Sequence, residues 1–122
     1  MTIVLNHTIV PVRDKDAAAR FFAQIFGLPY AGADGHFAKV RVNDQLTLLF
    51  DDDTAHKSHH LAFHVSDGEV DAILARVKAA GIAFGSGPDS TEDGKLNDCG
   101  GGRGFYFKDP DGHLLELMTV PQ

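Results

Sequence analysis

The sequence lacks the features that mark several large classes of protein. Among its 122 residues there is a single cysteine, Cys99, so no internal disulfide framework is possible and a reducing cytoplasm is expected. Acidic residues outnumber basic ones by 17 to 11, and no basic run is present, which argues against a nucleic-acid partner. No apolar stretch is long enough to cross a membrane, and the chain does not begin like a secretion signal. We therefore expect one cytoplasmic domain over residues 1–122, with no nucleic-acid or membrane partner.

The clearest local signal is a turn near the end of the chain. Two apolar runs flank Asp109-Pro110-Asp111-Gly112. Pro110 suits the second position of a tight turn, and Gly112 accepts the left-handed conformation that closes it. The pattern predicts a β-hairpin with strands near Arg103–Lys108 and His113–Thr119.

A carboxylate sits in the middle of the second predicted strand. Because side chains alternate between the two faces of a strand, Glu116 shares a face with Leu114 and Met118. A charge on an otherwise apolar face costs free energy unless it meets a cation or hydrogen-bond donors. Glu116 therefore needs a partner from another part of the chain.

The chain contains an internal repeat. His7 precedes His60 by 53 positions, and Asp14 precedes Asp67 by the same number. The expected strands are Asn6–Val12, Tyr30–Ala31, Phe37–Val42, Gln45–Phe50, His60–Val65 and Ile82–Phe84, with helices that start after Asp14 and Ser66 and end at Gly27 and Gly81. Two unrelated strand–helix pairs are the weaker alternative to a repeated βαβββ unit in residues 3–52 and 58–120. The predicted fold is α+β, with paired βαβββ repeats forming curved mixed sheets around a cleft and helices on the outer face.

Two histidines and one carboxylate share this predicted cleft. Apolar neighbours of His7 and His60 should pack beneath the helices, which leaves both rings facing the cleft beside Glu116. Two histidines and a carboxylate with open positions suit one divalent ion of Fe(II), Mn(II), Ni(II) or Zn(II). The alternative is that polar residues such as these are simply common at strand starts.

Three further residues are candidates for contact with a substrate. His64 lies roughly 13 Å along its strand from His60, too far to share the ion, so it is either a substrate contact, a general acid or base, or a structural histidine. The hydroxyl of Tyr106 is placed to donate to a metal-bound oxyanion, with an ordinary aromatic core role as the alternative. Arg103 is either a clamp for an anionic substrate or a plain surface arginine.

The stretches Leu5–Val10, Ala19–Pro29 and Gly104–Glu116 resemble the vicinal oxygen chelate superfamily, also called the glyoxalase/bleomycin resistance/dioxygenase family. The resemblance implies a divalent metal held at His7, His60 and Glu116. It also implies a substrate that chelates this metal through adjacent oxygens, with the metal acting as a Lewis acid.

The resemblance also limits the reaction. Glyoxalase I-like members use a fourth ligand, a carboxylate at the end of the first repeat, and Leu49 occupies that position here. Fosfomycin-resistance thiol transferases match in length, in the three ligands and at Tyr106, whereas bleomycin-binding proteins use no metal. We expect a metal-dependent glyoxalase-like lyase, isomerase or thiol transferase acting on a small oxygenated metabolite; the alternative is a non-enzymatic bleomycin-resistance-type binding protein. A homodimer is expected, because a single chain of this size would leave apolar edges and faces exposed.

Overall fold

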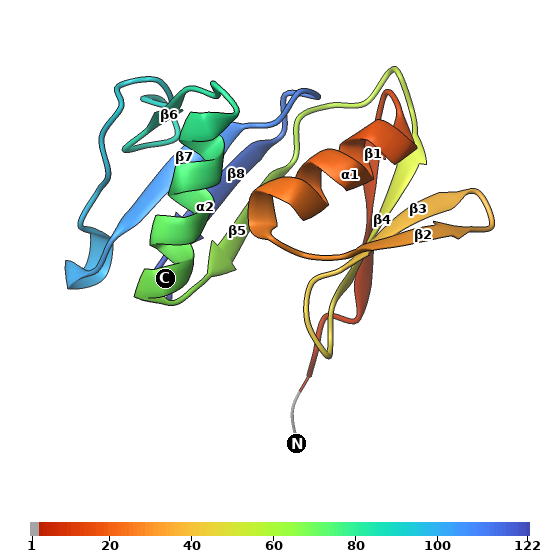
Figure 1. Ribbon diagram of the computed structural model, residues 1–122, viewed down its shortest axis with the longest axis horizontal. Helices are drawn as coiled ribbons and strands as arrows, with labels where there is room; N and C mark the ends of the chain where they lie inside the picture. Colours follow the sequence, from red (N-terminus) through yellow and green to blue (C-terminus); the bar gives the residue numbers. More distant parts are fainter. Residues whose placement is uncertain (1–2) are drawn as a thin grey trace. The chain divides into compact units, whose positions relative to one another are not determined.

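The computed structural model describes residues 3–122 and divides the chain into two units, the second of which is Ser58–Gln122. Unit one contains β1 (His7–Val12), α1 (Lys15–Phe26), β2 (Tyr30–Asp34), β3 (Phe37–Arg41) and β4 (Thr47–Asp52). Unit two contains β5 (His60–His64), α2 (Asp67–Ala79), β6 (Phe84–Gly85), a 3₁₀ turn (Cys99–Gly101), β7 (Gly104–Lys108) and β8 (Leu114–Met118) (Figure 1). Met1 and Thr2 lie outside the described residues. They belong to the first residues of the chain, which are interpreted from the sequence as unlike a secretion signal.

The two units have the same sheet topology. Strand order is β1-β4-β3-β2 in the first sheet and β5-β8-β7-β6 in the second. β1 pairs in parallel with β4, and β5 pairs in parallel with β8. The remaining pairs in both sheets are antiparallel. The predicted α+β fold built from two βαβββ repeats is therefore confirmed. Pro11 lies on β1, at an edge of its sheet, where a missing amide donor is tolerated.

Both helices begin where the sequence predicts; α1 ends at the predicted Gly27, whereas α2 ends at Ala79, with Ala80 as its cap, just before the predicted Gly81. The side chain of Asp14 accepts a hydrogen bond from the amide of Ala17 at 3.1 Å, and Gly27 ends α1 with φ 70°. Ser66 and Glu69 form the predicted capping box at the start of α2. No helix within residues 3–122 is both long and apolar enough to cross a membrane.

Each helix packs on one face of the sheet in its own unit. In unit one the ring of Phe22 lies 6.0 Å from that of Phe50 on β4. Buried strand residues on this face are Val10, Val12, Ala38, Val40, Leu48 and Phe50. In unit two α2 lies in front of β7 and β8 (Figure 1), and the buried strand residues are Phe105, Phe107, Leu115 and Leu117. The opposite face of each sheet carries both polar and apolar side chains, among them His7, Ile9, His60, Glu116 and Met118.

Three of the predicted strands differ from the structure by two or more residues at one end or both: β2, β6 and β4, which is Thr47–Asp52 where the sequence predicts Gln45–Phe50. The bounds predicted at Ile82–Phe84 are wrong, because pairing is confined to Phe84–Gly85, where the following loop folds back and Gly94 donates to the carbonyl of Phe84. β2 is longer than predicted and runs from Tyr30 to Asp34, with an irregular register next to its first residue. Its glycine and aspartate weaken the sequence signal, but pairing with β3 supplies the hydrogen bonds.

Candidate metal centre

The predicted turn fixes the hairpin that carries Glu116. Gly112 adopts φ 81°, and its amide donates to the carbonyl of Asp109 at 3.0 Å. The carboxylate of Asp109 also accepts from the amide of His113 at 2.9 Å. These bonds close the turn between β7 and β8 and set a register in which Tyr106 lies directly opposite Glu116. The predicted hairpin is confirmed.

Alternation along the strands brings three polar side chains together. Leu115 and Leu117 lie on the face that packs under α2, so Glu116 lies on the other face, where it is only 8% exposed. His60 Nε2 lies 3.1 Å from Glu116 Oε1. The Tyr106 ring is nearly parallel to that of His60, with centroids 6.2 Å apart and an interplanar angle of 17°. Unit two thus supplies the partner that Glu116 requires.

The hydrogen bond at Nδ1 of His60 indicates whether Nε2 carries a hydrogen or a lone pair. Nδ1 lies 3.1 Å from the carbonyl oxygen of Leu114, which can only accept, so Nδ1 carries the hydrogen. In a neutral ring Nε2 then holds a lone pair, and this lone pair points at the carboxylate of Glu116. Two such acceptors repel each other unless a cation or an added proton lies between them. A backbone acceptor at one ring nitrogen is also the usual arrangement of a histidine that ligates a metal through the other.

The spacing of the pair fits a metal ion. Two ligands about 2.1 Å from one ion and at right angles to each other are about 3 Å apart. The observed separation between His60 Nε2 and Glu116 Oε1 is 3.1 Å. Over the described residues 3–122, no group of three His, Cys, Asp or Glu side chains could by itself hold a metal ion. Unit two therefore presents two of the three predicted ligands.

His7 has the same place and the same internal arrangement in unit one. It begins β1, which pairs with β4 as β5 pairs with β8, so His7 opposite Thr47 corresponds to His60 opposite Leu114. Nδ1 of His7 lies 2.8 Å from the side-chain oxygen of Asn6, an acceptor, which leaves the lone pair on Nε2. Both histidines are thus held at Nδ1 and present Nε2.

The carboxylate has no counterpart in unit one. Glu116 lies two residues after Leu114, and the residue two after Thr47 is Leu49. By strand register, Leu49 therefore occupies in the first sheet the position that Glu116 occupies in the second. The sequence repeat gives the same correspondence. A fourth carboxylate ligand is absent at this position of β4.

Tyr106 is held close to the charge of Glu116. Burial, together with a hydrogen bond to Glu116 and the charge of its carboxylate, raises the pKa of Tyr106 to about 12. The phenol therefore stays protonated at neutral pH and donates toward the carboxylate. Its predicted contact with a substrate stays a prediction, but the ring lies beside His60 and Glu116 and not beneath α2.

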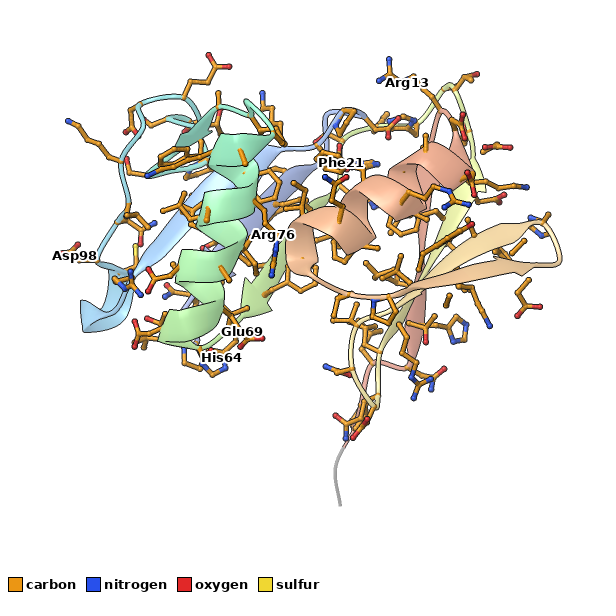
Figure 2. All side chains as sticks on the ribbon, in the orientation of Figure 1. Arg13, Phe21, His64, Glu69, Arg76 and Asp98 are labelled. Atoms are coloured by element: carbon orange, nitrogen blue, oxygen red, sulfur yellow. The ribbon has the colours of Figure 1, made fainter. Side chains whose placement is uncertain are left out.

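His64 lies on the same strand face as His60, at the end of β5. Its Nε2 lies 3.1 Å from the carbonyl oxygen of Thr119. With Ser66, Glu69 and their neighbours it lines an open hollow of about 520 Å³ at the start of α2, where Figure 2 shows His64 and Glu69 close together. Its role as a substrate contact or a general acid or base stays a prediction.

Arg103 ties the start of β7 to the first turns of α2. Its guanidinium donates to the carboxylate of Asp67 at 3.0 Å and to that of Asp71 at 2.8 Å, and both contacts raise the pKa of Arg103. No local pattern in the sequence indicates these partners, since they lie 36 and 32 positions away along the chain. Substrate binding by Arg103 stays a prediction, and an incoming anion would have to replace one of these carboxylates.

Comparison with known proteins gives one family. Residues 4–117 match the model of the Glyoxalase/Bleomycin resistance protein/Dioxygenase superfamily. The chain is 42% identical to the solved structure of oxidase ChaP-H2, with a TM-score of 0.94 over 99% of this chain and 96% of that one. For oxidase ChaP-H1 the identity is 40% and the TM-score 0.93, over 98% of each chain. Metallothiol transferase FosB of Shouchella clausii (strain KSM-K16) is 29% identical over 94% of this chain and 79% of its own.

Proposed function

The chain belongs to the Glyoxalase/Bleomycin resistance protein/Dioxygenase superfamily, and from this premise we propose that it is a metalloenzyme holding one divalent metal ion through His7, His60 and Glu116. The observation that carries the proposal is the His60–Glu116 pair. Nε2 of His60 faces the carboxylate oxygen at 3.1 Å while Nδ1 is committed to a backbone carbonyl. A cation between the two atoms resolves this arrangement. His7, prepared in the same way in unit one, is the third ligand.

The proposed reaction is oxidation of a small molecule that binds the ion through adjacent oxygens. Two histidines and one carboxylate with open positions are typical of non-haem Fe(II) oxygenases. The chain is also more similar to two oxidases, at 42% and 40% identity, than to the thiol transferase, at 29%. When bound, such an ion would supply Lewis-acid activation and, as iron, one-electron chemistry. The same ligands also suit Mn(II), Ni(II) or Zn(II), which fit the lyase, isomerase and thiol-transferase alternatives.

The chain's own residues then have separate tasks. Tyr106 orients Glu116 and, because its phenol stays protonated, can donate to an oxygen on which negative charge develops. His64 is a further proposed contact for the substrate, at the end of the same strand. Arg103 is a proposed substrate contact only for an anion that replaces Asp67 or Asp71.

The proposed assembly is a homodimer that binds a small-molecule substrate. Large apolar side chains are exposed near the start of the described chain: Ile3 is 97% and Leu5 64% exposed. Such side chains mark surfaces that a partner covers. Light scattering should give the mass of a dimer. The double variant Ile3→Ser, Leu5→Ser should dissociate into monomers at a higher protein concentration than the matched control Leu96→Ser. A parent protein that stays monomeric at micromolar concentration would contradict the dimer.

Metal analysis of the purified protein tests the central proposal. Elemental analysis should find one divalent ion per chain, and His60→Ala should remove it, whereas His59→Ala, one residue earlier, should not. The Fe(II)-loaded protein should consume oxygen with an accepted substrate, whereas the thiol-transferase alternative predicts Mn(II)-dependent loss of thiol with fosfomycin. A protein that binds no metal but binds bleomycin tightly would support the non-enzymatic alternative instead.

A further inference from the structure

The shared sheet topology assigns a position in unit one that corresponds to Tyr106. In unit two, Ala62, Glu116 and Tyr106 form one row across three neighbouring strands. The corresponding row in unit one is Ile9, Leu49 and Lys39. Lys39 therefore occupies in the first sheet the place that Tyr106 occupies in the second, one row away from the histidine.

Lys39 lies on the same sheet face as His7. Its neighbours Ala38 and Val40 are buried on the α1 face, opposite Phe50 and Leu48, so Lys39 is on the other face, with its side chain 33% exposed. The next row along this face is His7, Thr47 and Arg41. Two cationic side chains thus share the His7 face, in a chain with a net charge of −6.

The present partners of these cations are weakly held or neutral. Nζ of Lys39 lies 3.2 Å from a carboxylate oxygen of Asp34, whose side chain is 68% exposed. Arg41 donates to the backbone carbonyl of Asp44 at 2.6 Å. Exposed ion pairs contribute little to stability, so a ligand anion can take the place of Asp34. A second acidic residue of this face, Asp51, already pairs with His36 at 3.1 Å.

The side chains between His7 and the cations are apolar. Neighbouring strands are about 4.8 Å apart, so Lys39 and Arg41 lie about 10 Å of backbone distance from β1. Ile9, which is 49% exposed, and Leu49 lie between them on the same face. A flat apolar ring can lie over these two side chains while its oxygens reach an ion held by His7. A negative group at the far end of the ring then meets the cations.

We propose that Lys39, with Arg41 beside it, binds an anionic group of the substrate and so selects small apolar, metal-chelating molecules that carry a carboxylate or a similar anion. This inference rests on the proposed function, because it takes His7 as a ligand of the metal. Neither cation touches the ion in this arrangement, so both act on specificity and not on metal binding.

A pair of probe ligands tests the inference by binding alone. The Fe(III)-loaded protein is titrated with catechol and with 3,4-dihydroxybenzoate, which differ only in a carboxylate, and the charge-transfer absorbance gives each Kd. The parent should bind the carboxylated probe at least tenfold more tightly. Lys39→Met should abolish this preference without changing the Kd of catechol, and Arg41→Gln should reduce it. Asp34→Asn should increase the preference, because it releases Lys39, and Lys57→Met is the matched control that should leave it unchanged.

The outcomes separate this inference from the function on which it rests. Equal affinity of the parent for both probes would overturn the inference alone, and so would an equal loss of both probes in Lys39→Met. If the protein takes up no iron, or gives no charge-transfer band with either probe, the proposed metal function fails and the inference fails with it.

Discussion

Tyr106 and Glu116 are directly paired across the β7–β8 hairpin, on adjacent antiparallel strands. The pairing places a phenol against a carboxylate that is almost fully buried. An oxygen of the same carboxylate lies 3.1 Å from Nε2 of His60. The pKa of Tyr106 therefore depends on the charge of the proposed metal centre. Removing that charge, or adding a cation to it, should therefore change the titration of Tyr106.

Titration of the metal-free protein at 295 nm should show this dependence. The chain contains two tyrosines, and Tyr106→Phe should remove the one with a pKa of about 12. Glu116→Gln should lower the pKa of Tyr106 but leave it above the ordinary value, because burial, the largest cause of the shift, remains. Since folding raises this pKa, the stability that the group contributes is fully present below pH about 10 and is lost as pH rises toward 12. If the pKa of Tyr106 is unchanged in Glu116→Gln, the phenol of Tyr106 does not interact with the carboxylate of Glu116.

Metal affinity should separate ligands from their neighbours. Glu116→Gln should weaken metal binding by at least about 100-fold, since even indirect partners of a ligand cost 10- to 100-fold. His64→Ala should change metal affinity by no more than about tenfold, because His64 is not a ligand, and Tyr106→Phe should weaken it by about 10- to 100-fold at most, because Tyr106 is only a hydrogen-bond partner of Glu116. Turnover in Tyr106→Phe should fall by about 100-fold, the effect of losing one donor to a developing charge. Loss of metal from His64→Ala would show that His64 is a ligand after all. Glu92→Gln, an exposed loop change, is the control.

The capping box of α2 should contribute to stability in a pH-dependent way. Ser66→Ala should lower the free energy of unfolding by about 1 kcal/mol in urea denaturation. Hydrogen bonds from the backbone and side chain of Ser66 lower the pKa of Glu69, so this stability is present above the unfolded pKa and is lost as pH falls through the lower folded value. Glu69→Gln should remove that part of the acid dependence, while Ser90→Ala should leave it intact. Equal acid sensitivity in Glu69→Gln and the parent would refute this role.

Two glycines of unit two should respond in opposite ways to alanine. A Cβ on Gly85 would lie 1.7 Å from the backbone oxygen of Ser90, so the loop must shift, at a cost of about 1–3 kcal/mol. At Gly68, in the first turn of α2, a Cβ meets nothing within 4 Å, and alanine should stabilise by about 0.5–1 kcal/mol. Thermal unfolding of the two variants measures both effects. Similar changes in the two would mean that the loop after β6 does not pack as described.

Local chemistry made much of the fold predictable from the sequence. Asp14 and Ser66 mark helix starts by side-chain capping, and Gly112 marks the turn that registers the last two strands. Such signals act over a few residues, so they survive in any tertiary context. β2 and β6 carry weaker signals, because their pairing depends on neighbouring strands and on a loop that folds back onto Gly85.

The candidate site was predictable only in part. Strand alternation placed His60 and Glu116 on one face, and the structure brings them together. It did not predict which ring nitrogen faces the carboxylate, since that depends on a carbonyl oxygen more than 50 positions away. The partners of Arg103 on α2 and the position of Lys39 opposite Leu49 likewise follow from tertiary pairing and strand register.

The matched rows of the two sheets also bear on selectivity. Two identical copies would offer a given ligand group identical surroundings on each sheet. Here the copies carry different side chains at matching positions, with Glu116 against Leu49 and Tyr106 against Lys39. A group bound over the second sheet meets a hydroxyl at the position where the first sheet presents an ammonium. The divergence of the repeats thus makes the two sheet faces chemically different, so each face favours ligand groups that the other does not.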